Sequence, residues 1–195
     1  MRIRRGSRWS LVAAAACAMG LLWPAPGAAQ TVTGHARAVQ ATTASPGGIT
    51  TTMLADTGSL GGPTDARESS AIEASIPSLL SGKALHATTI GWSDQVSSEA
   101  SIAGLAMTID GNTISADFVQ ARAISGKRSN VAVHINGLTV NGVATDVSGS
   151  PNQTITIPDG IIIINEQTGS VVNALHVIID GVADVVIASA SANAQ

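Results

Sequence analysis

Glu166 and His176 are the two residues whose types and spacing best fit acid–base chemistry. Glu166 lies in the polar run Asn165-Glu166-Gln167, directly after four consecutive isoleucines, and His176 lies further on inside an apolar segment. A hairpin between these segments would bring the carboxyl group opposite the imidazole, as general acid or base catalysis requires. A polar hairpin end explains the same residues without catalysis, so both interpretations stay open.

Asp117 and His134 are two further polar candidates, each within an expected strand. Asp117 directly precedes Phe118, and its position predicts a cross-strand pair or an internal hydrogen-bonded carboxylate. His134 lies between Val133 and Ile135. Strand alternation places the imidazole on the face opposite these two side chains, in a solvent-facing or cross-strand position.

The remaining motifs that carry chemistry do not occur in this sequence. The four histidines show neither H-x-x-x-H nor H-E-x-x-H spacing, and the turn aspartates form no D-x-D-x-D-G loop. G-x-S-x-G, S-x-x-K and phosphate-binding glycine loops are also missing. We therefore expect no catalytic residue, no metal site and no cofactor, and we expect that the protein is not an enzyme.

Five Asx-Gly dipeptides indicate how the chain is built around these residues. Asn-Gly and Asp-Gly tolerate the positive φ of tight hairpin turns, and each of the five lies between β-forming segments. Only three residues separate the second dipeptide from the third, so we expect Asn136-Gly137 to be a kink and Asn141-Gly142 the reversal. Asp180-Gly181 is expected to open a longer loop. The five dipeptides are Asp110-Gly111, Asn136-Gly137, Asn141-Gly142, Asp159-Gly160 and Asp180-Gly181.

About nine or ten short strands without a convincing helix predict an all-β fold. An antiparallel meander forming a two-sheet β-sandwich is the expected architecture, with a small-residue β-solenoid as the alternative. We expect a main β-domain over residues 84–190 and a disordered tail over 191–195. The Thr-, Ser-, Gly- and Pro-rich segment 30–83 is expected to be partly ordered and to contribute strands, with a short helical turn over Ala71 to Leu80.

Residues 1–29 have the pattern of a secretory signal. Four arginines precede an apolar stretch that is too short to span a membrane, and Gly27-Ala28-Ala29 suits cleavage before Gln30. A lipoprotein that is cleaved before Cys17 is the alternative. Cleavage after Ala29 would leave a mature chain with no cysteine and no transmembrane anchor, in the periplasm, outside the cell or on its surface.

Composition narrows the set of partners. The formal net charge is −3, and it becomes more negative when the arginines of the leader are removed. No basic patch lies beyond Lys127-Arg128, so nucleic acid is not an expected partner. Aromatic residues make up 2% of the chain, so the core must consist of Ile, Val, Leu and Ala. An exposed apolar patch around Trp92 would indicate a binding surface.

Several blocks of sequence occur in an order similar to that of the bacterial choice-of-anchor P family, over roughly residues 34–190. The resemblance implies a secreted or surface protein of a family with no established activity, so it supplies no catalytic residues. Members carry varied C-terminal sorting signals, but no such motif follows Ala190, so C-terminal anchoring is not expected. The blocks are Leu54-Ala55-Asp56-Thr57-Gly58, Ser98-Glu99-Ala100-Ser101, Asn112-Thr113-Ile114-Ser115-Ala116-Asp117, Pro151-Asn152-Gln153-Thr154, Ile164-Asn165-Glu166-Gln167, Val172-Asn173-Ala174-Leu175-His176-Val177 and Ala183-Asp184-Val185-Val186-Ile187.

These observations predict a secreted, non-enzymatic structural or cell-surface-associated protein of the bacterial envelope. The first alternative is an extracytoplasmic binding module whose partner is an unknown envelope or extracellular protein or polymer. The second is a secreted hydrolase that uses Glu166 or Asp117 with a histidine. The oligomeric state does not follow from the sequence.

Overall fold

The computed structural model describes residues 31–195, and over this range the chain is an all-β sandwich of two antiparallel sheets. The expected leader, including Cys17, lies outside the described residues. The strands are β1 (Val32–Ser45), β2 (Gly48–Asp56), β3 (Ala66–Ile76), β4 (Leu80–Trp92), β5 (Gln95–Ile109), β6 (Asn112–Gly126), β7 (Asn130–Asn136), β8 (Thr139–Val140), β9 (Val143–Ala144), β10 (Gln153–Ile157), β11 (Gly160–Thr168), β12 (Val171–Ile179) and β13 (Ala183–Ala194).

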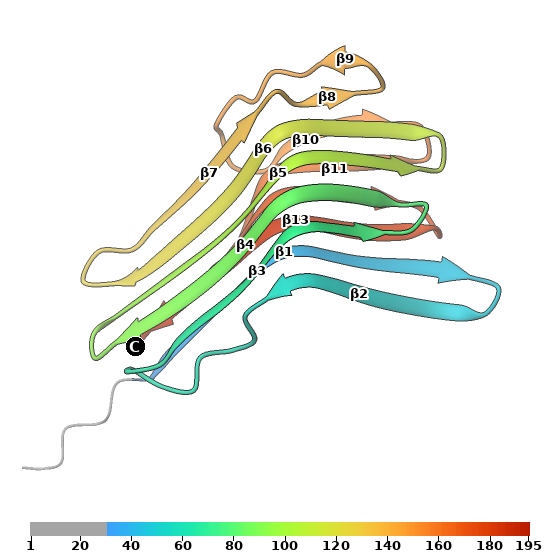
Figure 1. Ribbon diagram of the computed structural model, residues 1–195. Coiled ribbons are helices and arrows are strands. Elements are labelled where there is room, and N and C mark those ends of the chain that lie inside the picture. The colour runs from blue at the N-terminus through green and yellow to red at the C-terminus, as the bar shows by residue number, and fades with distance from the viewer. Residues whose placement is uncertain (1–30) are drawn as a thin grey trace, which may run out of the picture.

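The two sheets divide the chain into three stretches. Sheet A has six strands in the order β10-β11-β12-β13-β1-β2, and sheet B has the order β3-β4-β5-β6-β8-β9, with β7 also paired to β6. The chain therefore starts in sheet A, meanders through sheet B and returns to sheet A (Figure 1). This confirms the predicted two-sheet sandwich. The solenoid alternative is wrong, because neighbouring strands pair antiparallel through short turns.

The N-terminal segment contributes strands as expected, but its separation from the main domain and the disordered C-terminal tail need correction. Segment 30–83 supplies β1 to β3 and the start of β4, and β1 lies between β13 and β2, so it is not separate from the main domain. Ser191–Ala194 is not disordered but completes β13 beside β1. Thr31 and Gln195 exchange backbone hydrogen bonds of 2.9 and 3.1 Å. Strand pairing therefore orders a tail whose small and polar residues do not by themselves indicate a strand.

The expected helical turn over Ala71 to Leu80 is also wrong. The strand β3 runs to Ile76, and Leu80 already belongs to β4, so only a tight turn containing Pro77 lies between them. The backbone groups of this stretch that face β4 are satisfied by pairing between β3 and β4.

The Asx-Gly dipeptides behave as their spacing predicts. Asp110-Gly111 and Asn141-Gly142 have positive φ at both residues and reverse the chain between paired strands. Gly137, with φ of 65°, connects β7 to β8, and both strands pair with β6, so Asn136-Gly137 is the expected kink. At Asp159-Gly160 the turn is Pro158-Asp159, because Gly160 already pairs with Ile157. A loop from Asp180 to Val182 joins β12 to β13.

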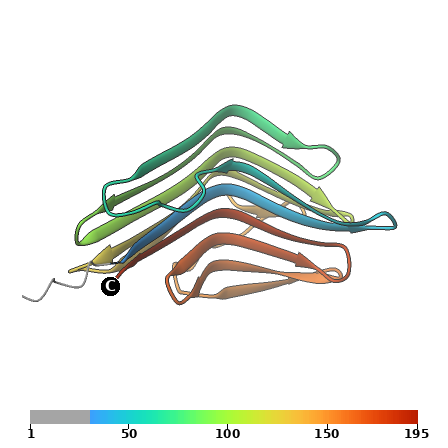
Figure 2. The same ribbon diagram turned by 90° about the horizontal axis from the view of Figure 1, so that it is seen from below.

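Both sheets are bent across the middle of their strands (Figures 1 and 2). At the bend a ladder omits one opposed pair without a shift in register, as with Ala38 and Ala188 between β1 and β13, and the β5–β6 ladder does the same at Gly104. Two successive side chains then share a face, as the buried Ala38 and Val39 do in β1. Positive φ occurs at the bend in several strands, at Ala55, Ala84, Gly104, Asn165 and Ala188.

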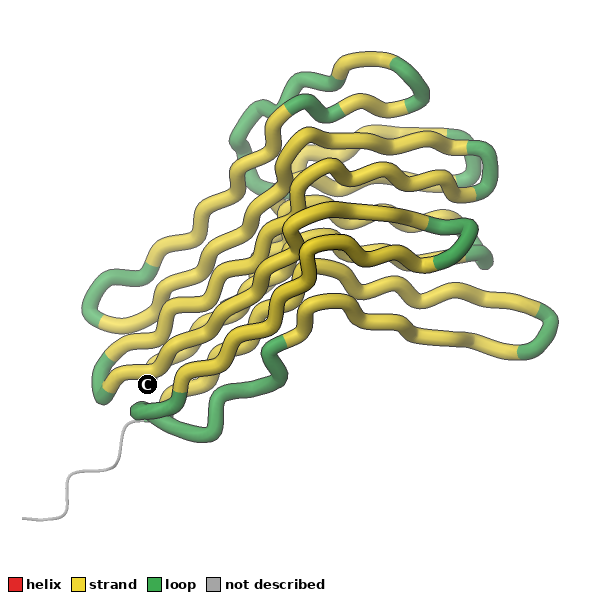
Figure 3. Tube along the Cα trace, viewed as in Figure 1, coloured by secondary structure: helices red, strands yellow, loops and turns green. Residues whose placement is uncertain are grey.

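The bend has the same sense in both sheets, so that they nest. In sheet A the two successive side chains at the bend are buried, for example Ala174 and Leu175 in β12, whereas in sheet B Asp117 and Phe118 of β6 both face outward. The outer face of sheet A is therefore concave and that of sheet B is convex, as Figure 2 shows for the bent strands. The strand trace in Figure 3 shows the same bend in successive strands.

The core between the sheets has the composition expected from the sequence. Every buried apolar residue in the described range is Val, Leu, Ile or Ala, apart from Met107. Small side chains let the sheets approach closely: a Cβ on Gly34 in β1 would lie 2.5 Å from Oγ1 of Thr89 in β4. Thr89 is fully buried and its hydroxyl pairs with that of Ser98 at 2.7 Å, so this buried polar pair is satisfied.

Candidate functional site

Glu166 and His176, predicted to face each other across a hairpin, meet on the concave outer face of sheet A. Nδ1 of His176 lies 2.9 Å from Oε2 of Glu166, across the β11–β12 pair. Nε2 of the same ring lies 3.0 Å from Oδ1 of Asp184 in β13. Asn173 donates to the same Glu166 oxygen at 2.6 Å. We call these four residues the β11–β13 cluster.

The β11–β13 cluster ties three strands together through one imidazole. Both ring nitrogens of His176 face carboxylate oxygens, and its side chain is 13% exposed. An imidazole can donate to two acceptors only when both nitrogens carry protons. The ring is therefore suited to bridge two anionic groups. Neither nitrogen is left to take a proton from a substrate, as a general base would do.

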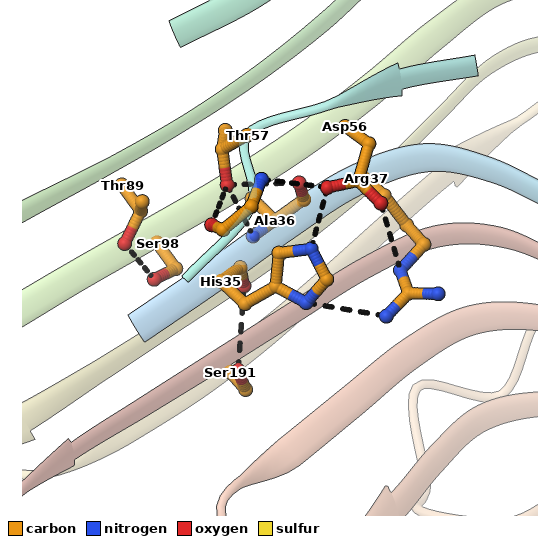
Figure 4. Close-up of polar contacts among 9 residues, drawn as sticks. His35, Ala36, Arg37, Asp56, Thr57, Thr89, Ser98 and Ser191 are labelled. Carbon is orange, nitrogen blue, oxygen red and sulfur yellow. Dashed lines mark hydrogen bonds and ion pairs between the residues drawn. The ribbon is translucent and has the colours of Figure 1, made fainter. Parts of the chain in front are cut away.

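A second cluster lies on the same face of sheet A, in β1 and β2 (Figure 4). Nε2 of His35 lies 2.7 Å from Oδ1 of Asp56, and Arg37 contacts Nδ1 of His35 at 3.2 Å. The backbone N–H of Gly58 donates to Oδ1 of Asp56 at 2.6 Å, and Nε of Arg37 lies 3.9 Å from its other oxygen. We call His35, Arg37 and Asp56 the β1–β2 cluster.

In the β1–β2 cluster the two ring nitrogens of His35 have different partners. Arg37 has only donors, so Nδ1 of His35 accepts from the guanidinium while its Nε2–H donates to Asp56. Burial raises the pKa of Asp56. The hydrogen bonds from His35 and Gly58 and the nearby positive charge lower it by more, so the pKa lies below its ordinary value. The Asp56 carboxylate is thus held in its ionised form.

Register explains why both clusters appear on one face. The strand β11 pairs Glu166 with Asn173 of β12, which pairs with Ser189 of β13. Ser189 in turn pairs with Arg37 of β1, which pairs with Asp56 of β2. The two clusters therefore lie at opposite ends of one cross-strand row beside the bend. Asn173 and Arg37 are two strands apart, which corresponds to about 10 Å.

Asp117 and His134 do not join this face. Alternation in β6 and β7 places both residues on the convex outer face of sheet B, where both are exposed. The Asp117 carboxylate occupies the space that a side chain at Gly137 would need, and the His134 ring lies 6.0 Å from that of Phe118. The four predicted polar residues therefore form no single site, because the core separates the two pairs.

Trp92 lies at the end of β4 and is 44% exposed. It lines a surface cleft of about 700 Å³ together with Pro63, Ile90 and two carboxylate residues, Asp65 and Asp94. The guanidinium of Arg67 and the N–H of Gly61 both donate hydrogen bonds to the carboxylate of Asp65, and these hydrogen bonds lower its pKa. The cleft thus combines an exposed aromatic ring with acidic groups at its rim.

Sequence reasoning missed His35, Arg37, Asp56 and Asp184 as members of these clusters. Asp184 comes soon after the Asp180 loop in the sequence, but it faces His176 from the next strand. The available signal is alternation within strands, since each of these residues lies on the outward-facing side of its strand. That signal becomes useful only when strand order and register are known.

Among residues 31–195 no group of three or more His, Cys, Asp or Glu side chains is arranged to hold a metal ion. Within the same range no helix has the length and apolar character to cross a membrane. No known protein family, no curated protein and no solved structure matches this chain. Its class is therefore defined by its own architecture, an all-β antiparallel sandwich of two sheets.

Proposed function

We propose that this chain is a secreted, non-enzymatic structural or surface-associated protein of the bacterial envelope. The observation that carries this proposal is the β11–β13 cluster, the best catalytic candidate in the sequence. Its imidazole is engaged at both nitrogens by carboxylates of neighbouring strands. A residue held in this way stabilises the sheet, and neither nitrogen of its ring is free to face a substrate.

Two features of the sequence support the location. Residues 1–29 have the charge, the apolar stretch and the small residues of a secretory leader. The resemblance to choice-of-anchor P proteins points the same way, since these are secreted or surface proteins. Mass spectrometry of the exported protein should find Gln30 as its first residue. Uncleaved protein confined to the cytoplasm would contradict the location.

A hydrolysis assay tests the non-enzymatic role. Purified protein is incubated with peptidoglycan, envelope polysaccharide and unfolded protein, alongside Glu166→Gln and His176→Gln. We expect no product that depends on either residue. We also expect both variants to lose about 1 kcal/mol of unfolding free energy, because each breaks a hydrogen bond to a charged group at a partly exposed site.

Matched control variants for this assay lie on the opposite face. Asp117→Asn and His134→Gln change the same side-chain types at exposed positions of sheet B, and we expect both to retain wild-type stability within about 0.5 kcal/mol. Hydrolysis that Glu166→Gln or His176→Gln abolishes, and that the controls preserve, would instead establish a hydrolase.

The second candidate function is an extracytoplasmic binding module, favoured by the cleft beside Trp92. An exposed aromatic ring next to apolar and polar groups is typical of binding surfaces. Trp92 is the only tryptophan beyond residue 29, so its fluorescence reports directly on this cleft once the leader is removed. Titration with soluble envelope polymer fragments should shift its emission to shorter wavelength.

The control for the binding experiment is Ile72→Ser, which changes another exposed apolar residue on β3 away from the cleft. A pull-down from envelope extract should recover a partner with wild-type protein and with Ile72→Ser, but not with Trp92→Ser. Equal recovery by all three proteins, or an unchanged emission spectrum, would argue against a binding site at this cleft.

A further inference from the structure

The strand β2 forms one edge of sheet A, and it lacks the usual protection of an edge strand. It pairs with β1 on one side, and no other strand of residues 31–195 pairs with its second side. Its sequence from Gly48 to Ala55 has no charged residue and no proline, and it includes three consecutive threonines. Natural edge strands are commonly protected by charge, proline or short length, because free backbone groups can pair with another chain.

The edges that β3, β9 and β10 form do have such protection. The strand β3 carries Arg67, Glu68 and Glu73 along its length. The strand β10 has five residues and is followed directly by Pro158, and β9 has only two residues. The strand β7 (Asn130–Asn136) also has an unpaired side without Asp, Glu, Lys, Arg or proline residues, but it has seven residues against nine in β2. The edge of β2 is therefore the longest that lacks such protection in the described part of the chain.

The pairing of β1 with β2 determines which backbone groups are free. Ser45 and Gly48 close a two-residue loop, so the amide and carbonyl of Gly48 point toward β1. Alternation along the ladder then directs those of Ile49, Thr51 and Met53 away from β1. The short contact of 3.0 Å between the hydroxyls of Thr42 and Thr51 agrees, since side chains approach most closely at non-hydrogen-bonded pairs.

The side chains on this edge are arranged symmetrically about Thr51. Ile49 and Met53 share the outer face with Thr51, each two residues from it, and they are 77% and 50% exposed. An antiparallel copy of β2 centred on Thr51 would place Ile49 of each chain beside Met53 of the other. Both exposed apolar side chains would then become cross-strand neighbours, which stabilises antiparallel pairs.

We propose that two copies of this chain associate through antiparallel pairing of their β2 strands about a two-fold axis at Thr51. The two six-stranded sheets would become one continuous antiparallel sheet. The β1–β2 hairpin extends beyond the ends of β3 and β4, so sheet B does not obstruct the second copy (Figures 1 and 2). Charge favours this site, because the negatively charged chain meets its copy along a neutral edge.

Sedimentation equilibrium over micromolar to millimolar concentrations tests this dimer. Thr51→Lys places two like charges opposite each other at the axis, and Thr51→Asp does the same with the opposite sign. We expect each variant alone to dissociate at least about tenfold more readily than wild type. Mixing the two variants should restore the dimer, because the lysine of one chain then faces the aspartate of the other.

The matched control is Thr154→Lys, an exposed outward threonine of β10 at the opposite edge of sheet A. It should dimerise like wild type, and circular dichroism should show all variants folded. A wild-type protein that stays monomeric throughout, a Thr51→Lys variant that dimerises like wild type, or a mixture that fails to associate would each overturn the proposal.

Discussion

At the scale of single residues, two histidines on one face of sheet A have opposite surroundings. His176 lies between two carboxylates, whereas His35 lies between a guanidinium and a carboxylate. The first ring faces two hydrogen-bond acceptors, and the second faces one donor and one acceptor. The same residue type thus connects strands in two ways, and in both cases an acidic side chain of a neighbouring strand completes the contact.

Asp56 gives the clearest pH dependence at this scale. Its pKa is lower in the folded chain than in the unfolded chain, so its ionised form contributes stability above about pH 4 that is lost as pH falls through the folded pKa. Asp56→Asn should therefore lower the unfolding free energy at pH 7 by about 1 kcal/mol, allowing for partial solvent exposure. The difference from wild type should shrink toward pH 3, as measured by urea unfolding.

The control for this prediction is Asp146→Asn, which changes an exposed aspartate in the loop before β10. It should leave the pH profile unchanged. Identical profiles for wild type and Asp56→Asn would mean that the His35 and Arg37 contacts contribute nothing to folding.

At the scale of elements, the bend of the strands depends on backbone conformations that alanine rarely adopts. Ala84 in β4 has φ of 46° and its side chain is exposed, so it makes little packing contact. The left-handed region is unfavourable for every residue type with a Cβ and is freely available to glycine. The bend is thus maintained by the surrounding ladders against a local preference.

Replacing Ala84 with glycine should therefore stabilise the protein, by up to about 1 kcal/mol. The matched control is Ala106→Gly, an exposed alanine of β5 without positive φ, which should destabilise by about 0.5–1 kcal/mol. Thermal and urea unfolding of both variants measure the difference. Equal destabilisation by the two changes would show that the conformation at Ala84 is not a source of strain.

Turns could be predicted from sequence, but the bend could not. The turns at Asp110-Gly111 and Asn141-Gly142 can be predicted because aspartate, asparagine and glycine tolerate positive φ. Ala55 and Ala188 adopt the same region with no such signal, since the sheet rather than the residue imposes it. Conformations imposed by tertiary structure are invisible in a local pattern.

The candidate site likewise has one contact that the sequence predicts and others that only the strand order reveals. Glu166 and His176 could be predicted as neighbours because one hairpin joins their strands. Asp184 required the next strand pairing, and contact between His35 and Asp56 required knowing that segment 30–83 enters sheet A. The predictions of a helical turn and of a disordered tail were wrong because composition does not reveal the strands that pair with those segments and order them.

At the scale of the whole molecule, the first and last strands pair with each other inside sheet A. The strand β13 pairs with β1 along its length, and Val32 and Ala192 near this seam are buried. The chain therefore cannot complete its six-stranded sheet until its last strand is in place. Contacts between segments so far apart in the sequence imply slow folding relative to proteins with local contacts.

Removing residues 191–195 should destabilise the sandwich by more than about 2 kcal/mol, because several backbone pairs with β1 are lost. Urea unfolding of the truncated chain measures this loss. The double variant Ser191→Ala with Asn193→Ala keeps the backbone pairs and should stay within about 1 kcal/mol of wild type. A truncated chain as stable as wild type would show that the seam ends before residue 191.

The pairing of Thr31 with Gln195 also determines how the protein responds to force. A pull between these two residues would open the β1–β13 ladder like a zipper, loading one backbone pair at a time instead of shearing all of them together. The molecule is then mechanically weak between its ends. A load applied between Gln195 and the open edge of β2 would instead act across the β1–β13 and β1–β2 ladders, because β1 lies between β13 and β2.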